Sequence, residues 1–299
     1  MSVNTWAERV VVGIDGSEQS KDAALWAARE AVSRKRGLTL VHAVMPPVTT
    51  SAFGVGLPSG LEMMDDLREH ALKELDNIAS SLPGDDIESR VELSSPSGAL
   101  LTASETAALL VVGSRGLGGF KGLLLGSVGT QVAAHAQCPV VVIRALPSPD
   151  ARTVIVGIDA TPSTQAALRF AFDAASRHGW RLVAVHAWDV PSYDLLVVPN
   201  APIPVPLHDL ADDEIRLAAE VLSGFQVEYP EVVVETRLVR GAPRQAVLAA
   251  ATEAGLIVVG TRGHGQVIGA VLGSVSNAVL HHARVPVAVV PDDSESSAA

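Results

Sequence analysis

The stretch Val111-Val112-Gly113-Ser114-Arg115-Gly116 returns 147 positions later as Val258-Val259-Gly260-Thr261-Arg262-Gly263. In both places an apolar run leads into glycines, and nine residues separate the last glycine from a second small pair. That pair is Gly126-Ser127 in the first occurrence and Gly273-Ser274 in the second. An apolar strand followed by a glycine-rich loop and then a helix is typical of α/β proteins, so this segment decides the fold class.

The repeat extends well beyond the loop. Val11–Ser17 returns as Ile155–Thr161 after 144 positions. A repeat of about half the chain is too long for a solenoid unit and indicates a duplicated domain. We therefore predict one domain at 1–147, a second at 148–291 and a disordered tail at 292–299.

Each copy alternates short apolar runs with segments of helical periodicity. The runs are Val10–Asp15, Leu38–Val44, Ile87–Leu93, Leu109–Gly113 and Pro139–Ile143, then Val154–Asp159, Leu182–Trp188, Val232–Val239, Leu256–Gly260 and Pro286–Val290. Continuous Val, Ile and Leu strands separated by helices predict a parallel sheet covered on both faces. We expect two tandem, doubly wound, Rossmann-like α/β domains with five parallel strands each and ligands at the C-terminal strand ends.

Composition excludes several classes of protein. A formal charge of -11 without a basic run disfavours binding to nucleic acid or to an acidic membrane surface. No apolar run reaches the roughly 20 residues that span a bilayer, and the N-terminus does not resemble a signal peptide, so we expect no membrane insertion. Cys138 is the one cysteine and aligns with Val285, which favours a small buried apolar residue over a catalytic thiol.

The glycine-rich loop has the composition of an anion cradle. Glycines permit positive φ and close approach of the main chain to a ligand. A helix start adds unpaired N–H groups and the positive end of the helix dipole, and Ser127 or Ser274 adds a hydroxyl. The alternative is a structural turn in which that serine caps the next helix. Identical spacing in both copies favours a phosphate site.

Each polar residue near the loop could have either a ligand-binding or a structural role. Asp15 and Asp159 end the first strand of each copy, where a carboxylate binds a ribose hydroxyl or magnesium, or caps the next helix. His42 and His186 lie within buried strands without ligand spacing, which favours structural histidines. The chain has no Walker-type phosphate loop and no acidic residue spaced to hold a dinucleotide ribose.

These features together resemble the universal stress protein family. The resemblance rests on Gly-x2-Gly-x9-Gly-Ser in both copies, the opening Val-Gly-Ile-Asp, the Val-His-Ala of the second strand and the closing Pro-Val-Val-Val-Ile. It covers nearly the whole chain and matches the ATP-binding branch, whose fold is that of the adenine-nucleotide α-hydrolases. The resemblance implies a cytoplasmic, stress-induced regulator that binds ATP, with or without Mg2+, and has slight or no ATPase activity.

The resemblance also implies the binding residues. Phosphate contacts fall on Gly113, Gly116, Gly126, Ser127 and Val128, and on Gly260, Gly263, Gly273, Ser274 and Val275. The rest of each loop is included, namely Ser114, Arg115, Leu117, Gly118 and Gly119, and Thr261, Arg262, His264, Gly265, Gln266 and Ser276. Gly13, Asp15 and Ala43, repeated as Gly157, Asp159 and Ala187, surround the base and ribose.

Three functions stay open on this reading. The first is a non-enzymatic regulator with two ATP sites, which forms a homodimer and acts on unidentified protein partners. The second is a slow magnesium-dependent ATPase that uses Asp15 or Asp159. The third is an interaction scaffold in which nucleotide is incidental. The family's last strand mediates domain pairing, so Pro139–Ile143 and Pro286–Val290 are expected near that contact.

Overall fold

The computed structural model describes residues 6–45, 60–117, 125–159, 161–188, 207–261 and 272–292. The chain divides into two compact units. The first contains the described residues up to Leu146 together with Arg284–Pro291, and the second contains Pro147–Ala283. Apart from Asp292, the predicted disordered tail lies outside the described residues.

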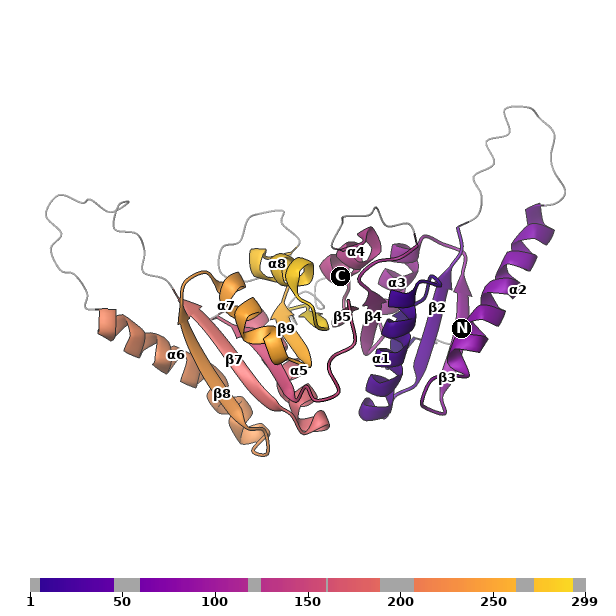
Figure 1. The fold of residues 1–299 in the computed structure, drawn as a ribbon. Coiled ribbons are helices and arrows are strands. Elements are labelled where there is room, and N and C mark those ends of the chain that lie inside the picture. The colour runs from indigo at the N-terminus through magenta and orange to yellow at the C-terminus, as the bar shows by residue number, and fades with distance from the viewer. Residues whose placement is uncertain are drawn as a thin grey trace, which may run out of the picture. The chain divides into compact units, whose positions relative to one another are not determined.

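The first unit alternates strands and helices as the apolar runs predict (Figure 1). Its elements are β1 (Val10–Gly13), α1 (Glu18–Arg34), β2 (Leu38–Ala43), α2 (Gly60–Ala79), β3 (Ile87–Glu92), α3 (Pro96–Ser104), β4 (Leu109–Gly113), α4 (Ser127–His135) and β5 (Val140–Ile143). The alanine face of α1 is fully packed, with Ala23, Ala24, Ala27 and Ala28 all at 0% exposure. Small side chains there let the helix lie close to the sheet.

The second unit repeats the same order. Its elements are β6 (Thr153–Ile158), α5 (Pro162–His178), β7 (Arg181–Trp188), α6 (Leu207–Glu228), β8 (Val234–Arg240), α7 (Pro243–Ala250), the short 3-10 helix η2 (Ala251–Glu253), β9 (Leu256–Gly260) and α8 (Ser274–His282). Phe172 of α5 is fully buried and stacks on Phe225 of α6 with ring centroids 5.3 Å apart. This contact anchors α6 to the body of the unit.

Strand order places the predicted ligand edge. In the first unit the order is β3-β2-β1-β4-β5, all parallel, and in the second it is β9-β6-β7-β8, also parallel. The chain direction across the sheet reverses between β1 and β4, and again between β6 and β9. In open α/β sheets a ligand crevice forms at this switch point, outside the C-terminal strand ends. The predicted fold class is confirmed.

The last strand of the chain belongs to the first unit. β10 (Val287–Val290) pairs antiparallel with β5, with Val287 opposite Val142 and Val289 opposite Val140. All residues of both strands are buried. Pairing with β10 therefore covers the edge of β5, which would otherwise present unpaired backbone groups.

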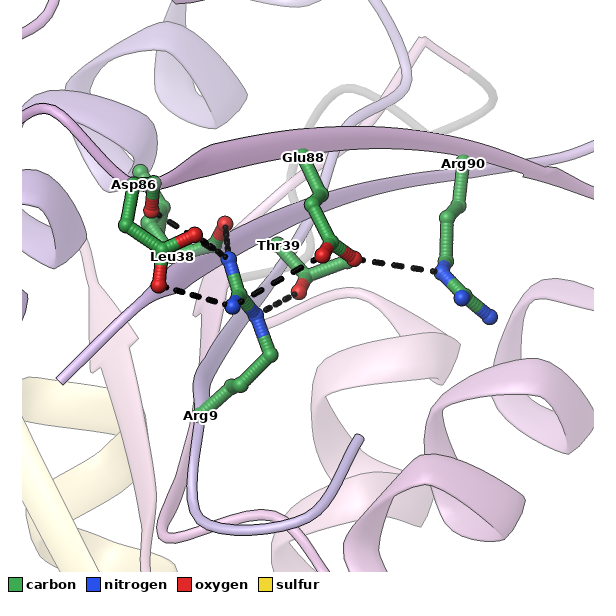
Figure 2. A network of polar contacts seen from close by, with 6 residues as sticks. All are labelled: Arg9, Leu38, Thr39, Asp86, Glu88 and Arg90. Atoms are coloured by element: carbon green, nitrogen blue, oxygen red, sulfur yellow. Dashed lines mark hydrogen bonds and ion pairs between the residues drawn. The ribbon is translucent and has the colours of Figure 1, made fainter. Parts of the chain in front are cut away.

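An arginine network lies at the N-terminal ends of the strands of the first sheet, away from the predicted ligand edge (Figure 2). The Arg9 guanidinium donates to Thr39 Oγ1 at 2.8 Å, to the Leu38 carbonyl at 2.8 Å and to both carboxylate oxygens of Asp86 at 2.8 and 3.0 Å. Glu88 lies 3.7 Å from Arg9 and 3.8 Å from Arg90. Such charge-assisted bonds tie the N-terminal ends of β1, β2 and β3 together.

In the second unit the corresponding arginine lies on the next strand, β7, and not just before the first strand. The 144-position shift aligns Arg9 with Thr153 and Gly37 with Arg181. Arg181 Nε donates to Thr153 Oγ1 at 2.9 Å, and its guanidinium lies 3.7 Å from Glu235. Gly37 has no room for a side chain, because a Cβ there would lie 2.3 Å from Arg9 Cζ. Each unit thus has one arginine at this pair of aligned positions, just before β1 in the first unit and at the start of β7 in the second.

This exchange gives a stability prediction. Arg9→Thr should lower the free energy of unfolding by about 2 kcal/mol, since the Thr39 hydroxyl and the Leu38 carbonyl, both on buried residues, lose a charged donor. Gly37→Arg alone should also destabilise, because two guanidinium groups then compete for one place. The double variant reproduces the second unit's arrangement and should recover at least half of the loss. Urea unfolding of the four proteins tests this, and strictly additive losses would contradict it.

Candidate nucleotide site

Asp15 joins the first strand to the glycine-rich loop. It follows β1 by two residues, and its Oδ1 accepts from the Ser17 N–H at 3.1 Å. Its Oδ2 accepts from the Leu117 N–H at 2.9 Å, a contact across 102 residues of sequence. Burial opposes ionisation of this carboxyl, but hydrogen bonds from Ser17, Leu117 and Ser20 outweigh it and lower the pKa of Asp15. Asp15 is therefore ionised, and its two oxygens bond to two segments. Through Leu117 it fixes the loop, and through Ser17 it orders the start of α1.

Position 116 requires a glycine because the main chain there lies very close to the Asp15 carboxylate. A Cβ on Gly116 would lie 2.1 Å from Asp15 Oδ2. Its φ lies outside the positive range, so left-handed backbone is not the reason for this glycine. Positive φ occurs instead at Gly16 (φ +83), in the turn between Asp15 and α1. Only a residue without a side chain lets the main chain of the loop reach this carboxylate.

Helix α4 begins without a side-chain cap. Its N-cap is Gly126, whose N–H donates to the Ser114 carbonyl at 2.8 Å, and no side chain accepts a capping hydrogen bond from the N–H groups of the first turn. The alternative in which Ser127 caps the helix is wrong, because Ser127 is the first helical residue. Helix α8 has the same arrangement, with Gly273 as an uncapped N-cap and its N–H bonded to the Thr261 carbonyl at 2.7 Å. Both helix starts keep free N–H donors for an anion.

Two buried hydroxyls mark the strand–loop junctions of both copies. Ser114 is 1% exposed and Thr261 is 7% exposed. Among the described residues, neither Ser114 Oγ nor Thr261 Oγ1 has a hydrogen-bond partner. An unpaired buried hydroxyl costs about 1–3 kcal/mol. Because the same cost recurs at aligned positions, this junction is not optimised for stability alone.

The second copy keeps the aspartate but partners it differently. Asp159 Oδ1 accepts from the Thr161 N–H at 3.0 Å, from Thr161 Oγ1 at 2.5 Å and from Thr164 Oγ1 at 2.6 Å. These bonds order the first turn of α5, as the capping interpretation predicts. Ser276 Oγ donates to the Gly260 carbonyl at 2.5 Å, a bond that ties α8 to the end of β9.

The remaining sequence-predicted residues lie along the same strand ends. Gly13 and Ala43 end β1 and β2, Gly113 ends β4, and Ser114 and Arg115 follow it. A Cβ on Gly113 would meet the Gln19 backbone at 3.0 Å, so this glycine lets α1 approach β4. In the second unit Gly157, Ala187 and Gly260 lie at the ends of β6, β7 and β9. Gly118, Gly119, Arg262, Gly263, His264, Gly265 and Gln266 lie outside the described residues.

A second arginine stands beside the first loop. Arg144 directly follows β5, and the neighbouring Ser114 N–H donates to the Ile143 carbonyl at 2.7 Å. Burial, and then the nearby Arg115 guanidinium, lower the pKa of Arg144. The aligned residue in the second copy is Pro291, so this extra cation distinguishes the two domains. Sequence reasoning missed Arg144, since its strand is not part of the loop motif.

The strand histidines hold backbone carbonyls, as the structural interpretation predicts. His42 Nδ1 lies 2.9 Å from the Ile14 carbonyl, and His186 Nδ1 lies 3.1 Å from the Ile158 carbonyl. Each ring links two adjacent strands at the ligand edge. His186 has a further contact that sequence reasoning missed, from its Nε2 to Glu214 Oε2 at 2.6 Å. No local signal connects these two residues, which are 28 positions apart.

Cys138 is a packing residue, as predicted. It is 6% exposed, and burial raises the pKa of its thiol to about 12. We expect no reaction with a thiol reagent in the folded protein and full reaction after unfolding, measured by absorbance. Cys138→Val, the residue of the second copy, should change the free energy of unfolding by less than about 1.5 kcal/mol. Rapid modification of the native protein would contradict this.

Within the described part of the chain, no three His, Cys, Asp or Glu side chains are grouped closely enough to hold a metal ion. In the same residues no helix has both the length and the apolar character needed to cross a bilayer.

Comparison with known proteins matches both halves of the chain to one family. The model of the universal stress protein family matches residues 7–144 and again 151–291. A universal stress protein of Mycobacterium tuberculosis is 38% identical over 289 residues, covering 94% of this chain and 95% of that protein. One from Mycolicibacterium smegmatis is 35% identical, covering 94% and 96%.

A solved structure supports the fold. The universal stress protein from Archaeoglobus fulgidus has a TM-score of 0.66 at 23% identity and covers 97% of this chain and 98% of its own. Two family matches that together span nearly the whole sequence, and relatives of equal length, establish the assignment. The chain belongs to the universal stress protein family, with two family domains in tandem.

Proposed function

We propose that the chain is an ATP-binding stress-response regulator with one nucleotide site per domain. It acts through nucleotide-dependent conformation or through protein partners, not through catalysis. The observation that carries this proposal is the contact of Gly116 with Asp15, beside a helix start that has no side-chain cap. A loop held so close that a Cβ cannot fit, next to free N–H donors, suits an anionic ligand.

The residues present fit a nucleotide. The N–H groups at the starts of α4 and α8 would hold the phosphates, with Gly126, Ser127 and Val128 in the first domain. The ends of β1 and β2, at Gly13 and Ala43, would receive the base and ribose. Arg115 and Arg144 lie near one another in the first domain and add positive charge there. The sites differ in this respect, so we expect the first to favour the more highly charged nucleotide.

Asp15 is a poor candidate for catalysis or for binding magnesium. Both of its carboxylate oxygens accept backbone N–H groups, so a metal ion bound to this carboxylate would compete with the hydrogen bonds that fix the loop. This favours a binding role over a slow ATPase. A bound Mg2+ would then be held mainly by the phosphates themselves.

Nucleotide binding is tested directly on the purified chain. Mass spectrometry of the denatured protein, followed by calorimetric titration of nucleotide-free protein with ATP, ADP, AMP and cyclic AMP, should show two adenine nucleotides per chain. No binding at about millimolar ATP would overturn the proposal. Multiple turnovers of ATP that Asp15→Ala abolishes, while binding persists, would favour the ATPase instead.

The proposal extends to assembly and partners. Chains are expected to form a homodimer and to change protein partners with the nucleotide state. Light scattering with and without ATP tests the first expectation, and a monomer at every concentration would exclude it. A pull-down with wild type and with both loops disabled tests the second, and an unchanged set of partners would favour the scaffold alternative.

A further inference from the structure

His186 lies at the predicted base-binding edge of the second domain and makes two polar contacts. It is 6% exposed and directly precedes Ala187 in β7. Its Nδ1 lies 3.1 Å from the Ile158 carbonyl of β6, and its Nε2 lies 2.6 Å from Glu214 Oε2 of α6. The ring therefore links two strand ends to the helix that follows them.

Both ring nitrogens face acceptors. A carbonyl oxygen and an ionised carboxylate accept hydrogen bonds and do not donate them. Both contacts are hydrogen bonds only when both nitrogens carry protons, so the ring is then an imidazolium paired with Glu214. A neutral ring can keep one of the two bonds. Histidine changes between these forms over about pH 5–8, so the link between α6 and the strand ends depends on pH.

In the described part of the first domain, the equivalent histidine has no such link to the long helix. His42 makes the equivalent bond to the Ile14 carbonyl at 2.9 Å. The buried positions of the two long helices, Ala71 and Leu75 in α2 and Ala218 and Leu222 in α6, align with a shift of 147. That shift places Leu67, which is 44% exposed, where the second domain has Glu214. The first domain, with Leu67 in place of Glu214, therefore serves as a natural control for the second.

Other charged groups on the elements around β7 bond to residues other than His186. Arg237 of β8, next to the Leu238 that pairs with His186, donates to Glu235 at 2.6 Å. Arg177 of α5 donates to Asp173 at 3.1 Å. Asp159, which follows Ile158, bonds the first turn of α5, and Arg244 is the charged residue of α7. Among the described residues, Glu214 is the charged group in contact with the ring.

We propose that Glu214, acting through His186, is a positioning residue that makes nucleotide affinity of the second domain, and not of the first, depend on pH. This rests on the proposed function. With the imidazolium present, α6 and the ends of β6 and β7 are held together and the base-binding edge is preformed. Loss of the proton at higher pH removes one bond, the edge loosens, and affinity falls.

The test uses full-length chains with one working site each. Gly116→Val leaves the second site, and Gly263→Val leaves the first. We expect ATP affinity of the second site, measured by calorimetry, to fall about three- to fivefold between about pH 5.5 and pH 8, and that of the first to fall by a smaller factor. The phosphates of ATP also titrate in this range and the two sites differ in charge, so the decisive comparison is the second site with Glu214 against the same site with Glu214→Gln.

Three variants separate positioning from folding. Glu214→Gln has an amide that pairs with either form of the ring, so it should keep the affinity and lose the extra pH dependence. Glu214→Leu, the residue of the first domain, should weaken the second site at low pH to its high-pH level. Leu67→Glu should confer pH dependence on the first site. Because Leu67 and Glu214 are on helix surfaces, we expect these chains to fold.

The outcomes are distinguishable. Equal pH profiles for the two sites, or an unchanged profile in Glu214→Gln, would overturn the inference while leaving nucleotide binding intact. No nucleotide binding at either site would overturn the proposed function and this inference together. Nitrogen NMR of the His186 ring at the two ends of this pH range gives a readout without nucleotide: the inference requires two protonated ring nitrogens at the lower pH and one at the higher, and a ring with the same form at both would overturn it.

Discussion

Gly116→Val should abolish ATP binding to the first domain while the protein stays folded. The new Cβ alone would lie 2.1 Å from Asp15 Oδ2, so the loop must move away and the Leu117–Asp15 bond must break. The phosphates then lose both the close main chain and its fixed position. We expect affinity at this site to fall at least about 100-fold, which corresponds to about 3 kcal/mol. Calorimetry should show stoichiometry falling by half.

Matched variants make this result specific. Gly224→Val is the control, since apart from the neighbouring backbone of α6 itself no atom lies within 4 Å of a Cβ at Gly224. Gly263→Val, at the aligned position outside the described residues, should remove the other half of the bound nucleotide, and the double variant nearly all. The stability cost of Gly116→Val should stay near 1–2 kcal/mol, about one hydrogen bond and some strain. Wild-type stoichiometry in the double variant would show that the motif is a structural turn.

Val289→Asp should be the most destabilising single substitution considered. Val289 is 1% exposed in β10, opposite Val140 of β5, and the strands are apolar throughout. A carboxylate there has no buried partner and either pays desolvation or disrupts the pairing of the two strands. We expect a loss of at least about 3 kcal/mol in the free energy of unfolding of the first unit. Thermal and urea unfolding measure it.

A charge placed on an exposed valine provides the control. Val233, just before β8, is 71% exposed, and Val233→Asp should change stability by less than about 0.5 kcal/mol. Val289→Asp should also bind an apolar dye, because separation of β10 uncovers the edge of β5. Equal stabilities of the two aspartate variants would mean that the β5–β10 pairing contributes little to the first unit.

Much of the fold follows from the sequence because its signals are local. The runs Leu109–Gly113 and Leu256–Gly260 are strands with the predicted bounds, and the helices following Gly126 and Gly273 begin where the motif places them. Apolar periodicity, glycines at strand ends and the internal repeat act over a few residues, so they can be read without coordinates. The same signals indicated the ligand edge of each domain.

Roles that depend on distant partners could not be read this way. Sequence allowed either positive φ or close approach of the main chain for the loop glycines, and Gly116 is required by close approach to the Asp15 carboxylate, about 100 residues earlier in the chain. Ser127 was a reasonable cap by residue type, yet the helix begins one residue earlier than that role requires. Side-chain direction and loop path decide both cases, and neither has a local signature.

By itself, the sequence determined two tandem α/β domains, the positions of their strands and the glycine-rich loop that we propose as a phosphate site. The tertiary structure alone decided that β10 completes the sheet of the first unit, that Arg144 stands beside Arg115, and that Glu214 reaches His186. Periodicity reports which face of an element is buried. Which partner covers that face, and which charges meet there, is set by packing between residues far apart in the chain.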